Sequence, residues 1–252
     1  MSLIRTLRLV YPVIISILWL SGCSSITAPD ISGLQSTELS QLNQSKGNYY
    51  GSGRIFFKNP DAKHSGELEI QVAAESELRL SIYTPLVGSL IYELRANTEK
   101  FLLLNFQENN YVLEANTSKV RQTWLGMDLS LTELKWLLLG RLPENDKSWQ
   151  RQVLPAGELL LIQGTVEIRL EFNSAGQIVS MIKSLNGVQE YRAQIPLYQK
   201  HAGILLPRKI SIVDYTGNNQ WLMLISEILA PSKMKNLEYS QPAGMQRLFR
   251  NQ

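Results

Sequence analysis

The sequence LRLSIYTPLVGSLIYEL, from Leu78 to Leu94, contains two short stretches in which apolar and polar residues alternate. Alternation with a period of two predicts β-strands that bury one face. The segment TPLVGS joins the two strands, so Leu86 and Val87 are expected at the tip of a turn. Apolar residues at a tip either serve a contact outside the domain or fold back onto a neighbouring segment. The stretch therefore predicts a hairpin with an apolar tip.

The same alternation recurs through most of the chain from Tyr49 onward. In GELEIQV, Leu68 and Ile70 alternate with glutamates, and VEIRLEF, residues 166–172, repeats the pattern. Further segments of this kind are 54–58, 89–94, 100–106, 111–114, 159–163, 177–185, 209–214 and 220–229. Turn-forming sequences such as NSAG and DYTGNN separate many of them. The pattern predicts a mainly β domain built on a long, strongly curved antiparallel sheet.

One interval, residues 116–142, interrupts the strand pattern and predicts two helices. Its second half, LSLTELKWLLLGRLP, begins with Ser130 and Glu133 at the spacing of a capping box and ends with Gly140 and Pro143. Leu134 and Leu138 belong to its apolar face. We expect these helices to lie over the concave side of the sheet. A β-sandwich with one additional helix is the alternative architecture.

The amino terminus has the three parts of a secretory signal peptide. Arg5 and Arg8 precede an apolar run over residues 9–20, and small residues follow. The run is shorter than the approximately 20 residues that a membrane-spanning helix needs. The residues Leu20-Ser21-Gly22-Cys23 match the bacterial lipobox, whose cysteine is lipidated and becomes the mature amino terminus. An ordinary signal peptide that happens to contain a cysteine is the alternative.

Cys23 is therefore the expected lipidation site, carrying acyl chains such as palmitate, and residues 1–22 are the expected signal peptide. Each buried CH₂ of an acyl chain contributes about 0.8 kcal/mol, so two or three chains anchor a protein stably. Residues 23–46 then form a lipidated tether, residues 47–230 the folded domain, and residues 231–252 a tail. Ser24 follows the cysteine, and the sorting rule of enteric bacteria assigns such lipoproteins to the outer membrane.

Charge and motifs exclude several functional classes. The net charge of +3 falls to about +1 without the two arginines of the signal peptide, so no strong field attracts nucleic acid. Cys23 is the only cysteine, which excludes disulfides and cysteine-rich zinc sites. The two histidines, His64 and His201, are expected in polar loops, and no nucleophile, metalloprotease or phosphate-loop motif occurs. We expect a protein that is not an enzyme and that uses neither metal nor cofactor.

Several of these segments together resemble the LolB family of outer-membrane lipoproteins. The family has a strand, a Pro-Leu-Gly-Ser-like turn and a strand that ends in Glu-Leu, as in residues 78–94 here. It also has a two-helix segment with Gly-Met and a closing Leu-Gly-x-Leu-Pro, which matches LGM at residues 125–127 and LLGRLP at residues 138–143. Near the C terminus, LPRKISIVD followed by WLMLISEIL resembles the last strand pair of the family.

This resemblance implies an unclosed β-barrel with a helical lid over an apolar cavity. The implied function is to accept lipoproteins from a periplasmic LolA-like carrier and to insert them into the outer membrane as a monomer. Pro85, Leu86 and Val87 would form the membrane-insertion loop. The candidates for the cavity wall, which are equally compatible with ordinary core, are Leu68, Ile70, Leu80, Ile82, Leu134 and Leu138. A carrier of free lipid and a structural accessory lipoprotein are the alternative functions.

Overall fold

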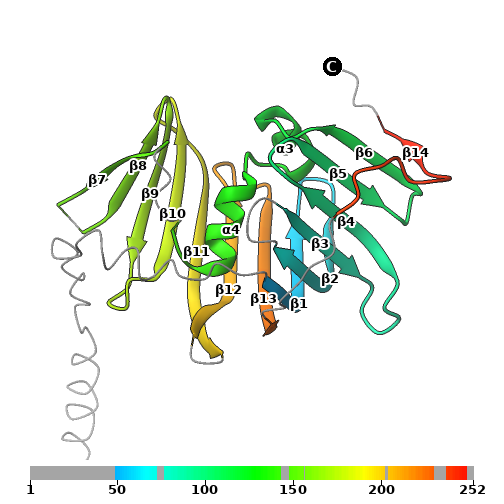
Figure 1. Ribbon diagram of the computed structural model, residues 1–252, viewed down its shortest axis with the longest axis horizontal. Helices are drawn as coiled ribbons and strands as arrows, with labels where there is room; N and C mark the ends of the chain where they lie inside the picture. The colour runs from blue at the N-terminus through cyan, green and yellow to red at the C-terminus, as the bar shows by residue number, and fades with distance from the viewer. Residues whose placement is uncertain are drawn as a thin grey trace, which may run out of the picture.

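The computed structural model describes residues 49–72, 77–142, 148–155, 157–201, 204–229 and 237–248. The expected signal peptide, Cys23 and the tether lie outside these residues. The described chain forms one sheet of fourteen strands with two α-helices (Figure 1).

The strands follow one another as antiparallel neighbours in two series. The first series is β1 (Tyr49–Lys58), β2 (Lys63–Val72), β3 (Leu78–Tyr83), β4 (Leu90–Ala96), β5 (Lys100–Asn105) and β6 (Asn110–Ala115). The second is β7 (Gln150–Val153), β8 (Leu159–Gln163), β9 (Val166–Phe172), β10 (Ile178–Leu185), β11 (Val188–His201), β12 (Ile204–Asp214) and β13 (Gln220–Leu229). Pairing of β1 with β13 joins the two series into one sheet.

The sheet does not close into a barrel. Its order runs β14-β6-β5-β4-β3-β2-β1-β13-β12-β11-β10-β9-β8-β7, so β14 (Gln246–Arg247) and β7 are its two edges. The sheet curves strongly, and both halves face the helices (Figure 1). The expected mainly β, curved and unclosed architecture is confirmed, and the sandwich alternative is wrong because all fourteen described strands belong to one sheet.

The two helices lie in the connection from β6 to β7. Because β6 lies near one edge and β7 forms the other, this connection crosses the concave side of the sheet (Figure 1). Helix α3 spans Ser118–Leu125 and helix α4 spans Leu131–Leu139. Ser130 and Glu133 form the predicted capping box, and each helix ends at a glycine in the left-handed conformation, Gly126 and Gly140.

Most of the core lies between the concave face of the sheet and α4. Leu134, Leu137 and Leu138 of the helix are fully buried there. They share one continuous hydrophobic cluster with inward-facing residues of both strand series, among them Leu68, Ile70, Ile168 and Leu170. The alternating pattern of the strands thus supplies one wall of the core and the leucine-rich helix supplies the other.

A smaller cluster covers the outer side of the sheet near β14. Leu102, Leu104 and Tyr111 are buried there against Tyr239 and Met245 of the C-terminal segment. The same segment adds β14 parallel to β6, with hydrogen bonds from the Gln246 and Leu248 amides to carbonyls of that edge. Residues 237–248 therefore pack on the domain although they belong to the tail that we expected beyond it.

Candidate functional site

A pocket of about 480 Å³ lies between α3 and the concave face of the first strand series. Its wall is formed mainly by apolar side chains from β1, β3, β4, β5, α3 and β13, including Ile55, Leu80, Ile82, Leu94, Trp124 and Trp221. Residues Lys58 to Asp61 of the β1–β2 turn and Asn219 of the β12–β13 turn line it as well. The pocket is thus an apolar space with a polar rim, as a site for an acyl chain requires.

Two of the six candidate cavity residues line this pocket. Leu80 and Ile82 alternate along β3 and both face it. The other four pack elsewhere in the core and are absent from the pocket wall: Leu68, Ile70, Leu134 and Leu138. The strand pattern correctly predicted which side chains face inward. Alternation alone does not distinguish a side chain that lines a cavity from one in the closely packed core.

Aromatic side chains form one part of the pocket wall. The Phe57 and His64 rings stack with centroids 4.6 Å apart, and Tyr92 meets both rings edge-on. Phe57 and His64 are close because β1 and β2 place them directly opposite each other. The expectation that His64 lies in a polar loop is wrong, because it belongs to β2, and the sequence analysis proposed none of these three residues for the site. They lie near strand ends at positions that face inward. The alternation of apolar and polar residues does not mark such positions as functional.

The turn between β3 and β4 places the candidate insertion residues in solvent. Pro85, Leu86 and Val87 are all exposed, and Leu86 is fully exposed. Two bonds close the base of the turn, from the Thr84 amide to the Ser89 carbonyl at 2.8 Å and from the Ser89 amide to the Thr84 hydroxyl at 3.0 Å. The turn therefore holds its apolar tip away from the domain.

Leu86 also has an unusual backbone conformation. Its φ is +73°, and the Val87 amide donates to the Pro85 carbonyl across it at 2.9 Å. This is the rare form of the γ-turn, in which a residue with a side chain is strained by roughly 1–3 kcal/mol. A strained, fully exposed leucine contributes nothing to the core, so its side chain is available for an outside contact.

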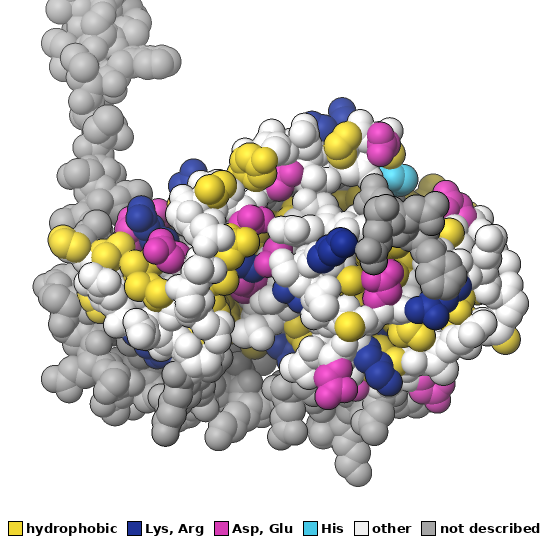
Figure 2. Space-filling model, turned by 90° about the horizontal axis from the view of Figure 1, so that it is seen from above, with side chains coloured by type: hydrophobic (Ala, Val, Ile, Leu, Met, Phe, Trp, Pro, Cys, Tyr) yellow, Lys and Arg dark blue, Asp and Glu magenta, His cyan; other side chains and the backbone are white. Residues whose placement is uncertain are grey.

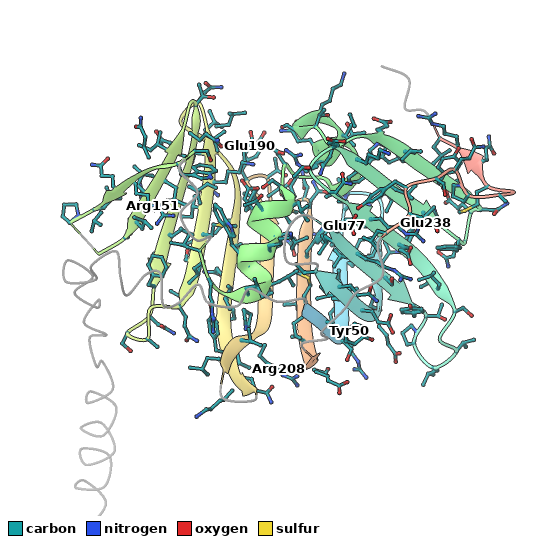
Figure 3. All side chains as sticks on the ribbon, in the orientation of Figure 1. Tyr50, Glu77, Arg151, Glu190, Arg208 and Glu238 are labelled. Carbon is teal, nitrogen blue, oxygen red and sulfur yellow. The ribbon has the colours of Figure 1, made fainter. Side chains whose placement is uncertain are left out.

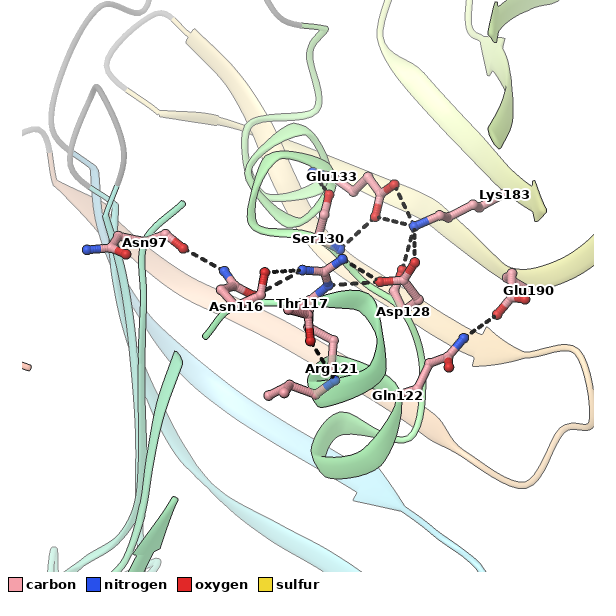
Figure 4. Close-up of polar contacts among 11 residues, drawn as sticks. Asn97, Asn116, Thr117, Arg121, Gln122, Asp128, Ser130, Glu133, Lys183 and Glu190 are labelled. Carbon is pink, nitrogen blue, oxygen red and sulfur yellow. Dashed lines mark hydrogen bonds and ion pairs between the residues drawn. The ribbon is translucent and has the colours of Figure 1, made fainter. Parts of the chain in front are cut away.

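Four charged groups, of which Asp128, Glu133 and Lys183 are buried and Arg121 is half-buried, fix the helices to the sheet (Figure 4). The Lys183 ammonium of β10 contacts a carboxylate oxygen of Asp128 at 3.0 Å and one of Glu133 at 3.0 Å, and donates to the Asp128 carbonyl at 2.7 Å. Arg121 of α3 binds the other Asp128 oxygen at 2.6 Å. Two cations thus balance two anions at the junction of α3, α4 and β10. We refer to Arg121, Asp128, Glu133 and Lys183 as the ionic junction.

The ionic junction sets the charge states around it. Burial disfavours the ionised form of Asp128, but the neighbouring Lys183 and Arg121 outweigh it and lower the pKa of the carboxyl group. Burial, together with the nearby Glu133 carboxylate, raises the pKa of Tyr191 well above its ordinary value. The carboxylate of Asp128 therefore stays ionised and the phenol of Tyr191 stays neutral near neutral pH.

Other kinds of site were searched for in the part of the chain that the structure describes. No group of three or more His, Cys, Asp or Glu side chains there is arranged to hold a metal ion. None of the described helices has the length and apolar character needed to cross a bilayer.

Comparison with known proteins agrees with this geometry. The model of the family described as outer membrane lipoprotein LolB matches residues 47–225. Comparison with curated protein sequences finds no significant match.

Solved structures share the fold at low sequence identity. An outer membrane lipoprotein-sorting protein domain from Vibrio parahaemolyticus is similar, with 8% identity, a TM-score of 0.55, and coverage of 79% of this chain and 92% of that one. A LolA superfamily protein from Nitrosomonas europaea has 11% identity, a TM-score of 0.51 and coverage of 79% and 91%. A DUF1329 family protein from Desulfovibrio piger has 7% identity, a TM-score of 0.58 and coverage of 83% and 96%.

Proposed function

Because the chain belongs to the family of the outer membrane lipoprotein LolB, we propose that it accepts lipoproteins from a periplasmic LolA-like carrier and inserts them into the outer membrane. In this proposal the protein is a monomer anchored through acyl chains on Cys23 and faces the periplasm. It needs no catalytic residue, because transfer of a lipoprotein breaks and forms no covalent bond.

The observation that carries the proposal is the apolar pocket beneath α3. Each CH₂ group that leaves water for such a pocket contributes about 0.8 kcal/mol, so a long acyl chain is held there without any polar contact. Leu80 and Ile82 on β3 and Trp124 on α3 line opposite sides of the space. An acyl chain in the pocket would thus lie between the sheet and the first helix.

Release into the bilayer is assigned to the turn at residues 84–89. β3 carries Leu80 and Ile82 in the pocket and then leads directly into the turn that exposes Leu86. Burial of one leucine in an apolar medium contributes about 1.5–3 kcal/mol, which is enough to bring this turn into the acyl region of a membrane. One strand would therefore link the holding site to the inserting residue.

The experiment is a transfer assay with a pocket-filling variant. The purified protein, with Cys23→Ser to remove the anchor, is incubated with a carrier–lipoprotein complex, and the lipoprotein is followed by co-purification. We expect the lipoprotein to change hands, and Ile82→Trp to block acceptance because the indole occupies the pocket. Ile82→Val, which leaves the pocket open, serves as the matched control.

The alternative functions predict different outcomes. A carrier of free lipid would bind a fluorescent fatty acid, with the same loss in Ile82→Trp, but would accept no lipoprotein. A structural accessory lipoprotein predicts a filled core, and a pocket of about 480 Å³ argues against it. A folded protein that accepts neither lipoprotein nor fatty acid would contradict the proposed function.

A further inference from the structure

The volume of the apolar pocket limits what it can hold. An engineered apolar cavity of about 150 Å³ takes one benzene ring, which has six carbon atoms. The pocket beneath α3 has a volume of about 480 Å³, roughly three times as large, and so takes about 18 carbon atoms. One acyl chain of about 16 carbons fills such a space, whereas two of them need roughly 800 Å³. The pocket thus has room for one chain.

The roof of the pocket, helix α3, is held in place by polar contacts. Arg121 binds Asp128 at 2.6 Å, within the ionic junction. Gln122 donates to the Glu190 carboxylate of β11 at 3.3 Å, and Figure 3 shows Glu190 at the upper margin of the sheet. The helix is therefore attached both to the segment that follows it and to a strand of the second series, which keeps the roof at a set height.

Two glycines bring neighbouring groups closer than a side chain would allow. A Cβ atom at Gly66 of β2 would lie 2.5 Å from the Cγ2 atom of Ile82 and 2.7 Å from the Tyr83 carbonyl oxygen. A Cβ atom at Gly126, where α3 ends, would lie 2.4 Å from the Asn219 side-chain oxygen. Ile82 and Asn219 both line the pocket. Ile82 thus has no space behind it into which it could retreat, and the end of α3 rests directly on the β12–β13 turn.

A second groove, of about 560 Å³, adjoins the pocket but does not suit an acyl chain. Phe57 and Trp221 line both spaces. The lining of the groove also includes two lysines and three uncharged polar residues: Lys58, Lys63, Ser65, Ser211 and Gln220. An acyl chain gains free energy only where it leaves water for apolar surroundings. The groove therefore does not provide the place that a second chain would need.

The visible surface offers a second chain no continuous apolar area either. Among the described side chains seen in Figure 2, apolar ones form small groups separated by polar and charged ones. Scattered apolar side chains are ordinary on a protein surface, whereas a site that shelters a ligand requires a contiguous patch. Shelter for an acyl chain on this side of the molecule is therefore concentrated in the pocket.

We infer that the pocket holds a single acyl chain of up to about 18 carbons, and that a lipoprotein with two or three chains leaves its other chains outside it. This inference rests on the proposed function, because it takes the pocket to be the acyl-chain site. It goes further by limiting the ligand to one chain for each protein molecule and by assigning Ile82 the role of setting the length of that chain.

The test measures affinity against chain length. The chain from residue 23 onward, carrying Cys23→Ser, keeps every described element, since these lie between residues 49 and 248. Saturated fatty acids of about 8 to about 22 carbons, each below its micelle concentration, compete with a fluorescent fatty acid. Each added CH₂ should tighten binding about fourfold until the chain has about 18 carbons, and the affinity should then level off.

A substitution in the wall should move this levelling point. Ile82→Trp adds about six atoms of carbon size, so the affinity should level off at about 12 carbons. Palmitate should bind about 200-fold more weakly than to the parent, and an acid of about 10 carbons should bind equally to both. Ile82→Val, and Phe56→Trp at a residue outside the pocket, should keep the parent's levelling point within about one carbon. Circular dichroism checks the fold of each variant.

A second measurement counts the chains directly. Native mass spectrometry of the parent, saturated with palmitate, should show one palmitate for each protein molecule. A peptide that carries one palmitoyl group and the same peptide with two should bind with equal affinity within about threefold, because the second chain gains no apolar surroundings.

Three results would overturn the inference. They are an affinity that levels off below about 14 carbons or rises up to the longest acid, two palmitates for each protein molecule, and much tighter binding of the two-chain peptide. Each would leave the proposed function intact, because acyl chains would still bind. A folded parent that binds no fatty acid would contradict the inference as well. Acceptance of a lipoprotein from the carrier, measured separately, then decides the proposed function.

Discussion

Leu86 combines full exposure with a φ that residues other than glycine rarely adopt. The hydrogen bonds between Thr84 and Ser89 maintain this conformation from the base of the turn, so the leucine itself is not needed to form it. The strain at Leu86 is therefore a cost to folding that a functional contact of its side chain would explain.

Substitution of Leu86 tests this separation of stability from function. Leu86→Glu should leave the free energy of unfolding within about 0.5 kcal/mol of the parent, as is usual at the surface, and should impair release of lipoproteins into liposomes. Leu86→Gly, which relieves the positive φ, should raise stability and impair release equally. Melting temperature and liposome transfer are measured on each variant. A large loss of stability in Leu86→Glu, or unimpaired release, would show that this turn is not the insertion device.

The ionic junction leads to a different prediction, because three of its four charged groups are buried. Lys183→Met should lower the free energy of unfolding by about 3–5 kcal/mol near neutral pH, since Asp128 and Glu133 lose a shared cation. In the parent, the lowered pKa of Asp128 stabilises the fold above the ordinary carboxyl pKa of 3.8, and this contribution is lost as the pH falls through the lowered value. In the variant, where Arg121 is the only remaining cation of the junction, acid instead removes negative charge that Lys183 no longer balances.

The stability difference between parent and Lys183→Met should therefore narrow as the pH falls. Urea denaturation of both proteins at neutral and acidic pH measures it, and Lys119→Met, a lysine outside the junction, controls for loss of charge. A difference of constant size at all pH values would mean that packing of the lysine stem, and not its charge, carries the effect.

For single residues, the sequence predicts which face of a strand a side chain lies on better than it predicts what that side chain contacts. The exposed tip at Pro85–Val87 follows from the two flanking strands, and Ser130 with Glu133 follows from the spacing of a capping box. Lys183 was missed, although it lies in the inward phase of an otherwise apolar strand, which is the signal of a buried charge. Its partners Asp128 and Glu133 lie 55 and 50 residues earlier in the chain, and nothing in the sequence indicates that pairing.

At the element scale, α4 is held at its end by a contact that only glycine permits. Gly140 has a φ of +64°, and a Cβ atom there would lie 2.6 Å from the Tyr198 ring of β11. The Tyr198 hydroxyl donates to the Ile178 carbonyl, and burial raises its pKa, so the ring is fixed and neutral. The helix end and two strands therefore meet at one closely packed point.

Gly140→Ala should lower the free energy of unfolding more than the backbone conformation alone explains. Gly187 provides the matched control, because it has a φ of +76° and open space around its Cβ position. Gly187→Ala should cost about 1 kcal/mol, and Gly140→Ala about 1–3 kcal/mol more, since Tyr198 or α4 must shift. Chemical denaturation of both variants measures the difference. Equal losses would show that the helix end adapts without cost.

The elements differ in how well their sequences predict them. β9 coincides with VEIRLEF because every second residue is apolar and both ends carry turn residues. β11 was missed, because Pro196 interrupts its pattern and proline is disfavoured within strands. The structure accommodates it where the pairing with β12 is irregular, between Gln194 and Leu197. β7 and β14 are too short to show a period.

At the scale of the whole molecule, the C-terminal segment protects one edge of the open sheet. It pairs with β6 and buries Leu102, Leu104 and Tyr111. Arg95 and Asn109 also donate to its carbonyls, at Glu238 and Gly244 respectively. An uncovered edge with apolar residues beside it invites pairing between molecules.

Deletion of residues 237–252 should therefore lower the melting temperature and produce self-association. Size-exclusion chromatography with light scattering, over a range of protein concentrations, measures the association. Deletion of residues 249–252 alone keeps every described contact of the segment and should leave the protein unchanged. A monomeric long deletion of normal stability would mean that the segment is dispensable for the edge.

The fold of the whole molecule was predictable because the alternation of apolar and polar residues recurs in most strands. That the barrel is open was implied by the family resemblance. The location of the pocket was not predictable in the same way. It depends on the space left between α3 and the strands beneath it, which is a property of tertiary packing. The same alternation therefore places Ile82 in the wall of the pocket and Ile70 in the closely packed core.

The connection that carries both helices starts at β6 and ends at β7, at opposite margins of an arch that is otherwise continuous. It therefore acts as a tie across the span. Widening of the arch would therefore pull on both helices and on the ion pairs that hold them to β10. If the pocket holds cargo as proposed, its capacity depends on this connection as well as on the sheet, and longer or shorter ties in related proteins should accompany larger or smaller guests.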